Sequence, residues 1–144
     1  MRRVLIILMG ALIATPLIAG EIGLIGQEAL LARLAQKDAN LVILDVRTPE
    51  EFAAGHVPGA VNVAHDQVAA RLPELATYKS KDVVVYCRSG RRSNLALEVL
   101  SANGFERLWH LEGDILAWQA QNRPLETSTA LAPTPDATPA PDPQ

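Results

Sequence analysis

The chain has 144 residues, of which 49% are hydrophobic, and it carries a formal net charge of −3. This length leaves room for one compact domain with a buried core, and the acidic balance argues against a nucleic-acid-binding protein, which needs Lys and Arg to neutralise phosphates. The single cysteine, Cys87, excludes an internal disulfide, a CxxC redox pair and a cysteine-based zinc site. The three histidines show no metal-ligand spacing, so we expect no metal site. From the acidic charge we expect no nucleic-acid partner.

The first twenty residues have the layout of a secretory signal peptide. Two arginines precede an apolar run over residues 4–13, a proline breaks the run, and the small residues Ala19 and Gly20 end the segment. The whole apolar stretch would span about 24 Å as a helix, which is short of the ~30 Å core of a bilayer. We therefore expect residues 1–20 to direct export to the periplasm, with cleavage after Ala19 or Gly20. An uncleaved membrane anchor is the alternative, because both cleavage sites place a large apolar residue where a small one is preferred.

Helical and strand patterns alternate along the rest of the chain. Continuous apolar runs over 41–46 and 83–86 have the length of strands buried on both faces, and this alternation predicts an α/β domain with a parallel sheet and helices on both faces. Other strands are expected over 60–63 and 107–111. Helices are expected over 26–40, 48–55, 65–75, 93–102 and 113–121, and a disordered Pro/Ala/Thr-rich tail over 126–144.

Two of these helices carry specific expectations. In the helix over 48–55, Thr48 and Glu51 have the spacing of a capping box around Pro49 at the first helical position. In the helix from Ser93, the spacing of Leu95, Val99 and Leu100 predicts one inward face.

Ligands of parallel α/β sheets bind beyond the carboxyl ends of the strands, and here the loop after Tyr86 stands out. Cys87 follows the buried strand directly, and its loop runs into a helix whose first amides and dipole favour an anion. Gly90 permits the loop to curl over the sulfur, and three arginines at 88, 91 and 92 add positive charge. These features predict that Cys87 is a thiolate at neutral pH rather than an inert buried thiol.

The length of the loop distinguishes between two kinds of cysteine chemistry, phosphate ester hydrolysis and sulfur transfer. A cysteine phosphatase loop carries an arginine at the sixth position after the nucleophile, whereas this chain has Ser93 there, and Arg92 lies one residue earlier. The shorter loop closes a tighter ring, which favours a single sulfur atom over a tetrahedral phosphate. A phosphatase or arsenate reductase on the same scaffold and a non-catalytic binding domain stay open as alternatives.

Three stretches of the chain resemble the rhodanese (thiosulfate sulfurtransferase) family. They are LDVRTPEEFAAGHVPGAVNV, the loop VVVYCRSGRRS, and LEGDILAW, in which Asp114 stands where the family usually has a second glycine. The resemblance covers about residues 23–124 and implies a single domain with a central, parallel five-stranded sheet. It implies a double displacement in which Cys87 takes sulfur from a donor such as thiosulfate and passes it from a persulfide to cyanide or a thiol.

The expected site residues follow from this chemistry. Cys87 is expected to be the catalytic nucleophile, and Arg88 and Arg92 to bind the donor anion, with Arg91 solvated. The wider set expected to bind the donor is Arg88, Ser89, Gly90, Arg91, Arg92 and Ser93. Asp45, Arg47 and His56 are expected to support the structure. The resemblance implies that no cofactor is needed. The expected partners are a small-molecule sulfur donor and a thiol or cyanide acceptor, and the protein is expected to be a monomer. Because a second cysteine is absent, discharge of the persulfide should need an external thiol or carrier.

Overall fold

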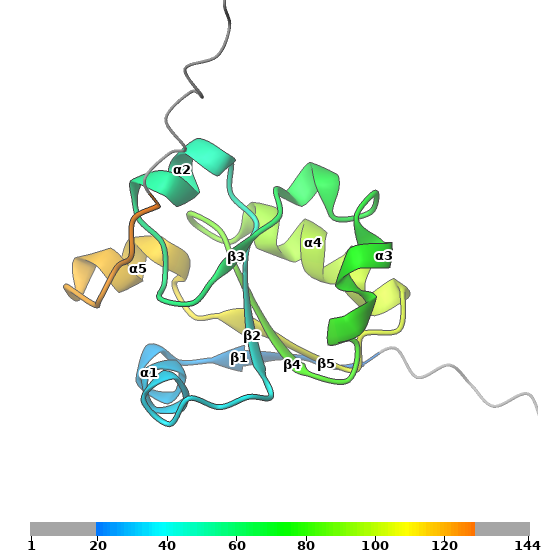
Figure 1. Cartoon of the computed structure of the whole chain (residues 1–144), viewed down its shortest axis with the longest axis horizontal. Helices are drawn as coiled ribbons and strands as arrows, with labels where there is room; N and C mark the ends of the chain where they lie inside the picture. Colours follow the sequence, from blue (N-terminus) through cyan, green and yellow to red (C-terminus); the bar gives the residue numbers. More distant parts are fainter. Residues whose placement is uncertain (1–19, 129–144) are drawn as a thin grey trace, which may run out of the picture.

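The computed structural model describes residues 20–128 as one five-stranded sheet with helices around it (Figure 1). The strand order is β1-β5-β4-β2-β3, and every neighbouring pair is parallel, which confirms the predicted α/β class. The strands are β1 (Ile22–Ile25), β2 (Leu41–Asp45), β3 (Val61–Asn62), β4 (Asp82–Tyr86) and β5 (Arg107–Leu111). The α-helices are α1 (Gln27–Ala35), α2 (Pro49–Ala54), α3 (Leu72–Leu75), α4 (Arg91–Ala102) and α5 (Asp114–Ala120).

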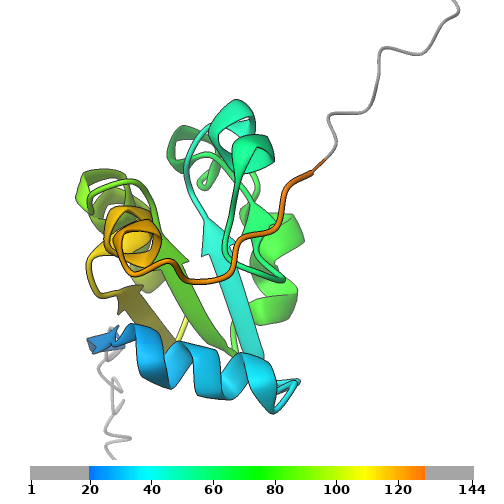
Figure 2. The same cartoon turned by 90° about the vertical axis from the view of Figure 1, so that its left-hand side faces the viewer.

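Helices α3 and α4 cover one face of the sheet, and α1 and α5 cover the other, whereas α2 lies beyond the carboxyl end of β2 (Figures 1 and 2). Each face has its own hydrophobic cluster. Leu44, Val85 and Leu97 belong to the cluster under α3 and α4, and Ile43, Val84 and Trp118 to the cluster under α1 and α5. The central strands β2 and β4 are therefore apolar on both sides, which is why they read as unbroken apolar runs in the sequence.

One predicted helix is wrong, and one strand was not predicted. The segment over 65–75 is not one helix: a 3₁₀ turn at His65–Gln67 (η1) is followed by the short helix α3, and Ala76–Tyr78 (η2) adds another 3₁₀ turn. Pro73 explains the break, because proline lacks an N–H donor and fits only the first turn of a helix. Strand β1 was missed because it is an edge strand with exposed apolar side chains, Leu24 being 69% exposed.

Helix α4 starts at Arg91, two residues before the predicted position, with Gly90 as its N-cap. Of the predicted inward face, Leu100 is buried and Val99 packs against the core, but Leu95 is 44% exposed, and Ala96 and Leu97 are buried instead. The prediction counted only large apolar residues, whereas the face against the sheet continues through two small ones, Ser93 and Ala96. This shift brings Ser93 inside the protein, next to the cysteine loop.

The folded chain extends to the first residue of the expected tail. Glu126 forms an antiparallel bridge with His56 through two backbone hydrogen bonds of 2.9 Å, and its carboxylate accepts a hydrogen bond from the Gly59 amide. Glu126 therefore belongs to the folded domain, against the prediction that the disordered tail begins at this residue. The rest of the predicted tail lies outside the described residues beyond position 128, as does the predicted signal peptide apart from Gly20. Over residues 20–128, the protein has no helix of the length and apolarity that a membrane span requires.

Candidate active site

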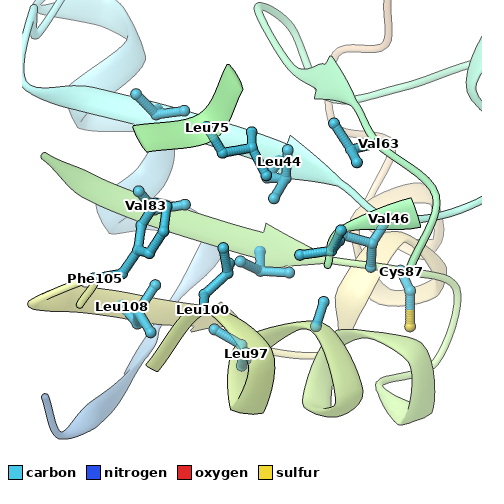
Figure 3. Packing of buried hydrophobic residues seen from close by; sticks show 14 residues of the cluster. Leu44, Val46, Val63, Leu75, Val83, Cys87, Leu97, Leu100, Phe105 and Leu108 are labelled. Atoms are coloured by element: carbon cyan, nitrogen blue, oxygen red, sulfur yellow. The ribbon is translucent and has the colours of Figure 1, made fainter. Parts of the chain in front are cut away.

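The sulfur of Cys87 sits at the junction between β4 and α4. Cys87 directly follows the last residue of β4, Tyr86, and is only 1% exposed (Figure 3). The backbone N–H of Gly90 donates a hydrogen bond to Cys87 Sγ over 3.0 Å. In residues 20–128 this is the one backbone amide bonded to the sulfur. An amide donor and the positive end of α4 both favour an anionic sulfur at this place.

The tight curl of the loop depends on Gly90. Its φ of 111° lies in the region that side chains avoid, and this conformation turns its N–H toward the sulfur. The space is also restricted, because a Cβ at Gly90 would lie 3.2 Å from Asp114 Oδ2 and 3.4 Å from His110 Cε1. The predicted need for glycine at this position is thus both conformational and steric.

Arg92 is bound by an acidic partner from another element. Its guanidinium forms a two-pronged ion pair with Glu51 of α2, with distances of 2.7 Å and 2.9 Å between nitrogen and oxygen atoms. Glu51 also forms a capping box with Thr48, which confirms the prediction from the sequence. The Glu51 hydrogen bonds raise the pKa of Arg92, with a smaller contribution from the Cys87 sulfur. Arg92 therefore ties α4 to α2 near the sulfur, and part of the charge expected for the donor is compensated by Glu51.

This pair gives a testable pH dependence of stability. Hydrogen bonds from Arg92 lower the pKa of Glu51 from 4.5 to about 2. Because the folded-state pKa is depressed, the pair stabilises the fold above the ordinary pKa of the carboxyl and loses this contribution as the pH falls toward 2. We expect the free energy of unfolding, measured with urea, to fall less steeply below pH 5 in Glu51→Gln than in the unchanged protein. Equal slopes in both proteins would contradict the assignment.

Arg88 and Arg91 are the exposed cations of the loop. Neither forms an ion pair with any residue in the range 20–128. Arg88 lines a pocket of about 220 Å³ together with Arg47, Glu51 and Leu116. A second pocket, of about 440 Å³, lies between the starts of α1 and α5 and contains no residue of the cysteine loop. The pocket beside Arg88 is therefore the better candidate for donor binding. Ser89 is exposed and has no side-chain hydrogen bond to the described residues.

Asp114 is the site residue that sequence reasoning missed. It starts α5, is 3% exposed, and its Oδ1 accepts hydrogen bonds from the Cys87 amide at 2.8 Å and from Ser93 Oγ at 2.9 Å. Its Oδ2 lies 3.0 Å from His110 Nε2. Burial acts to raise the pKa of Asp114, but these hydrogen bonds outweigh it and lower the pKa. Ser93, expected to bind the donor, is fully buried and instead supports the loop from its inner side.

Asp45 and Arg47 form a buried brace at the end of β2. Their side chains make a charge pair with a shortest distance of 2.6 Å, and Arg47 also donates to the Gly55 carbonyl. The Tyr86 hydroxyl donates to Asp45 Oδ2 at 2.6 Å and accepts from the Val57 amide. Burial, reinforced by the Asp45 carboxylate, raises the pKa of Tyr86, so its hydroxyl stays a donor. Because Tyr86 precedes Cys87, the brace fixes the strand end that carries the sulfur. Tyr86 was not predicted, since the sequence shows it only as part of an apolar run.

His56 lies in the turn after α2, away from the loop contacts of Cys87. Its Nδ1 is 2.8 Å from the Phe52 carbonyl, and its ring stacks on Phe52 at 3.7 Å. Its backbone carries the bridge to Glu126. These contacts place His56 in the packing of the turn, where the sequence analysis expected a supporting residue.

The arrangement defines a class of site: a buried thiol at the positive end of a helix, bonded by one amide, in a loop whose exposed arginines have no ion-pair partner among residues 20–128. Such a site can hold an anionic sulfur and attract a small anionic reagent. Over residues 20–128, no cluster of His, Cys, Asp and Glu side chains has the arrangement of a metal site.

The comparisons with known proteins identify the family. The Rhodanese-like domain family matches residues 27–121, and the chain belongs to this family. A sulfurtransferase of Allochromatium vinosum is 38% identical over 101 residues, a match that covers 70% of this chain and 92% of that protein. The resemblance in the three sequence stretches is thus confirmed, and the family supports a sulfur-transfer enzyme.

Other proteins similar to this chain are described by different activities. A tRNA uridine(34) hydroxylase of Cronobacter sakazakii is 33% identical over 90 residues, which are 60% of this chain but 26% of that larger protein. A solved structure from Rhodopseudomonas palustris, described as a possible tyrosine phosphatase, matches with a TM-score of 0.66 and 26% identity, covering 73% of this chain and 85% of that one. The family therefore does not by itself decide the reaction, which has to be argued from the site.

Proposed function

We propose that this protein transfers sulfane sulfur from thiosulfate or a similar donor to cyanide or a thiol, through a persulfide on Cys87. The observation that carries the proposal is the position of the Cys87 sulfur, which accepts the Gly90 N–H at 3.0 Å at the start of α4. An amide and a helix N-terminus favour an anionic sulfur, which is the form of the attacking thiolate and of the outer atom of a persulfide. The similarity to the Allochromatium vinosum sulfurtransferase supports the same chemistry.

The proposed reaction has two displacements. The Cys87 thiolate attacks the outer sulfur of thiosulfate, a new S–S bond forms on Cys87, and the donor S–S bond breaks with its electron pair leaving on sulfite. Cyanide or a thiolate then attacks the outer sulfur of the persulfide, and the Cys87 thiolate is released. No external oxidant, reductant or cofactor enters this balance.

Steady-state kinetics of the purified protein test this proposal. With thiosulfate and cyanide varied together, we expect thiocyanate formation with the parallel-line pattern of a double displacement. The competing function, hydrolysis of a phosphate ester, is suggested by the Rhodopseudomonas palustris neighbour, but Ser93 occupies the position of the phosphate-binding arginine and is buried. Hydrolysis of an aryl phosphate without thiocyanate formation would overturn the proposal. The intact cysteine loop argues against a non-catalytic binding domain.

The two exposed arginines give a matched pair of variants. Because Arg88 lines the pocket next to the loop and Arg92 is paired with Glu51, we assign the main attraction for the dianionic donor to Arg88. Loss of one charge–charge contact near a partly enclosed site is expected to raise KM for thiosulfate about tenfold in Arg88→Ala, with kcat changed less. Arg91→Ala is the control, with a change below about twofold. A larger effect for Arg91→Ala than for Arg88→Ala would reverse the assignment.

We also propose that the enzyme acts after export, on the evidence of the sequence of residues 1–20. When the full chain is expressed in a Gram-negative bacterium, the periplasmic fraction is expected to contain a shortened protein that starts at Gly20 or Glu21. Mass spectrometry of the N-terminal peptide measures this. A full-length protein in the membrane fraction would instead indicate a retained anchor.

A further inference from the structure

Asp114 adopts an unfavourable backbone conformation, and its carboxylate is bonded to the backbone of the cysteine loop. Asp114 has φ of 51° and follows Gly113, which has φ of 75°. A residue with a side chain costs about 1 kcal/mol in this left-handed region, where glycine fits freely. A Cβ at Gly113 would lie 2.3 Å from the Ala117 Cβ, so position 113 accepts glycine alone, while position 114 accommodates an aspartate. The hydrogen bonds of the carboxylate compensate the local cost.

These hydrogen bonds join Asp114 to the reacting residue. The carboxylate accepts from the amide of Cys87 itself, and it shares the proton donors of Ser93 and His110. Gly90 connects the two groups, since its N–H donates to the Cys87 sulfur while its α-carbon faces both Asp114 and His110. The Ile115 amide, next to Asp114, also donates to the Cys87 carbonyl at 3.1 Å. The first turn of α5 therefore holds the backbone of Cys87 from both its N–H and its C=O.

We infer that Asp114 and His110 form a positioning pair that sets how readily the Cys87 thiol loses its proton, a step on which the proposed sulfur transfer rests. Two effects act in opposite directions. The carboxylate fixes the loop in the conformation that bonds the sulfur, but its negative charge disfavours a second anion close by. The imidazole of His110, in contact with both oxygens of Asp114 at 3.0 Å and 3.2 Å, compensates that charge when it carries a proton.

The other charged groups around Cys87 are few. Arg88 and Arg91 are exposed cations near it in the chain, and Arg92 of α4 is paired with Glu51 of α2. On β5, His110 is flanked in the sheet by Val85 of β4 and Leu24 of β1, neither of which titrates. The His110 side chain is 16% exposed and the Asp114 side chain 4% exposed. Among the described residues, this pair places a carboxylate and an imidazole together against the backbone of the cysteine loop.

The test measures the rate of alkylation of Cys87 by iodoacetamide between pH 5 and 10, in the full folded domain. Asp114→Asn keeps an oxygen acceptor for the Cys87 amide but removes the charge, so the pH midpoint of alkylation is expected to fall by about 0.5 unit. His110→Gln keeps a hydrogen-bond donor but leaves the carboxylate uncompensated, so the midpoint is expected to rise by about 0.5 unit. In the double variant, the midpoint should return to that of Asp114→Asn alone, because no carboxylate charge is left to compensate.

Glu98→Gln is the matched control, because it removes an exposed carboxylate two turns along α4 from the sulfur and should leave the midpoint unchanged. If the two residues only support the loop, both single variants should shift the pH midpoint of alkylation in the same direction. Shifts in the same direction would therefore overturn the inference. Unchanged midpoints in both variants would overturn it too. If Asp114→Asn does not fold, an alkylation midpoint in His110→Gln that falls or stays unchanged overturns the inference. Alkylation does not require sulfur transfer, so failure of the proposed function would be seen separately, in the absence of thiocyanate.

Discussion

Replacement of Cys87 by serine is expected to lower the rate of thiosulfate-to-cyanide sulfur transfer by at least about 10³-fold, because the reaction then lacks the atom that carries the sulfur. A hydroxyl in place of the thiol cannot form a persulfide. The Gly90 amide and the start of α4, which stabilise an anionic sulfur in the unchanged protein, have no comparable anion to stabilise in the variant. Thiocyanate formation at saturating thiosulfate measures the effect.

The variant should fold, since serine differs from cysteine in one atom. Cys87→Ala is the companion variant: it removes the polar atom altogether and should be equally inactive, with a thermal midpoint close to that of the serine variant. Residual activity above a tenth of the original rate in either variant would mean that another group carries the sulfur.

Asp45→Ala is expected to lower the free energy of unfolding by about 3–5 kcal/mol, because it leaves Arg47 buried without its counter-charge. Arg47 is 5% exposed and Asp45 is 0% exposed, so water cannot replace the lost partner. The Tyr86 hydroxyl loses its acceptor in the same change. Urea unfolding at neutral pH measures the difference.

Tyr86→Phe separates the charge pair from the hydrogen bonds around it. It keeps the Asp45–Arg47 pair but leaves the Val57 amide without its 3.0 Å acceptor, so a smaller loss of about 1–3 kcal/mol is expected. If Asp45→Ala cost less than Tyr86→Phe, the brace at the end of β2 would not depend on the charge pair.

Local patterns predicted much of the fold and pointed to Cys87 as the candidate nucleophile. The apolar runs of β2 and β4 are visible because both faces of a central parallel strand are buried. The capping box of Thr48 and Glu51 is a short-range motif, and the structure contains it. Cys87 was recognisable because its strand, its glycine and its arginines are close in sequence.

The contacts around Cys87 could not be predicted from local patterns, because they join residues that are far apart in the sequence. Glu51 and Arg92 are separated by 41 positions, and the Cys87 amide reaches Asp114 across 27. Asp114 was visible as a departure from the expected second glycine, but its meaning depends on the packing of α5 against the loop. Ser93 was misplaced for a related reason: the start of α4 at Arg91 turns it inward, and only the backbone conformation of Gly90 sets that start.

Intact mass spectrometry of the purified protein after incubation with thiosulfate shows whether Cys87 carries the transferred sulfur. We expect a gain of one sulfur atom in the unchanged protein, persistence of this form until cyanide or a thiol is added, and no gain in Cys87→Ser. A protein that keeps its original mass while it turns over thiosulfate, or a sulfur gain that survives in Cys87→Ser, would contradict a persulfide on Cys87.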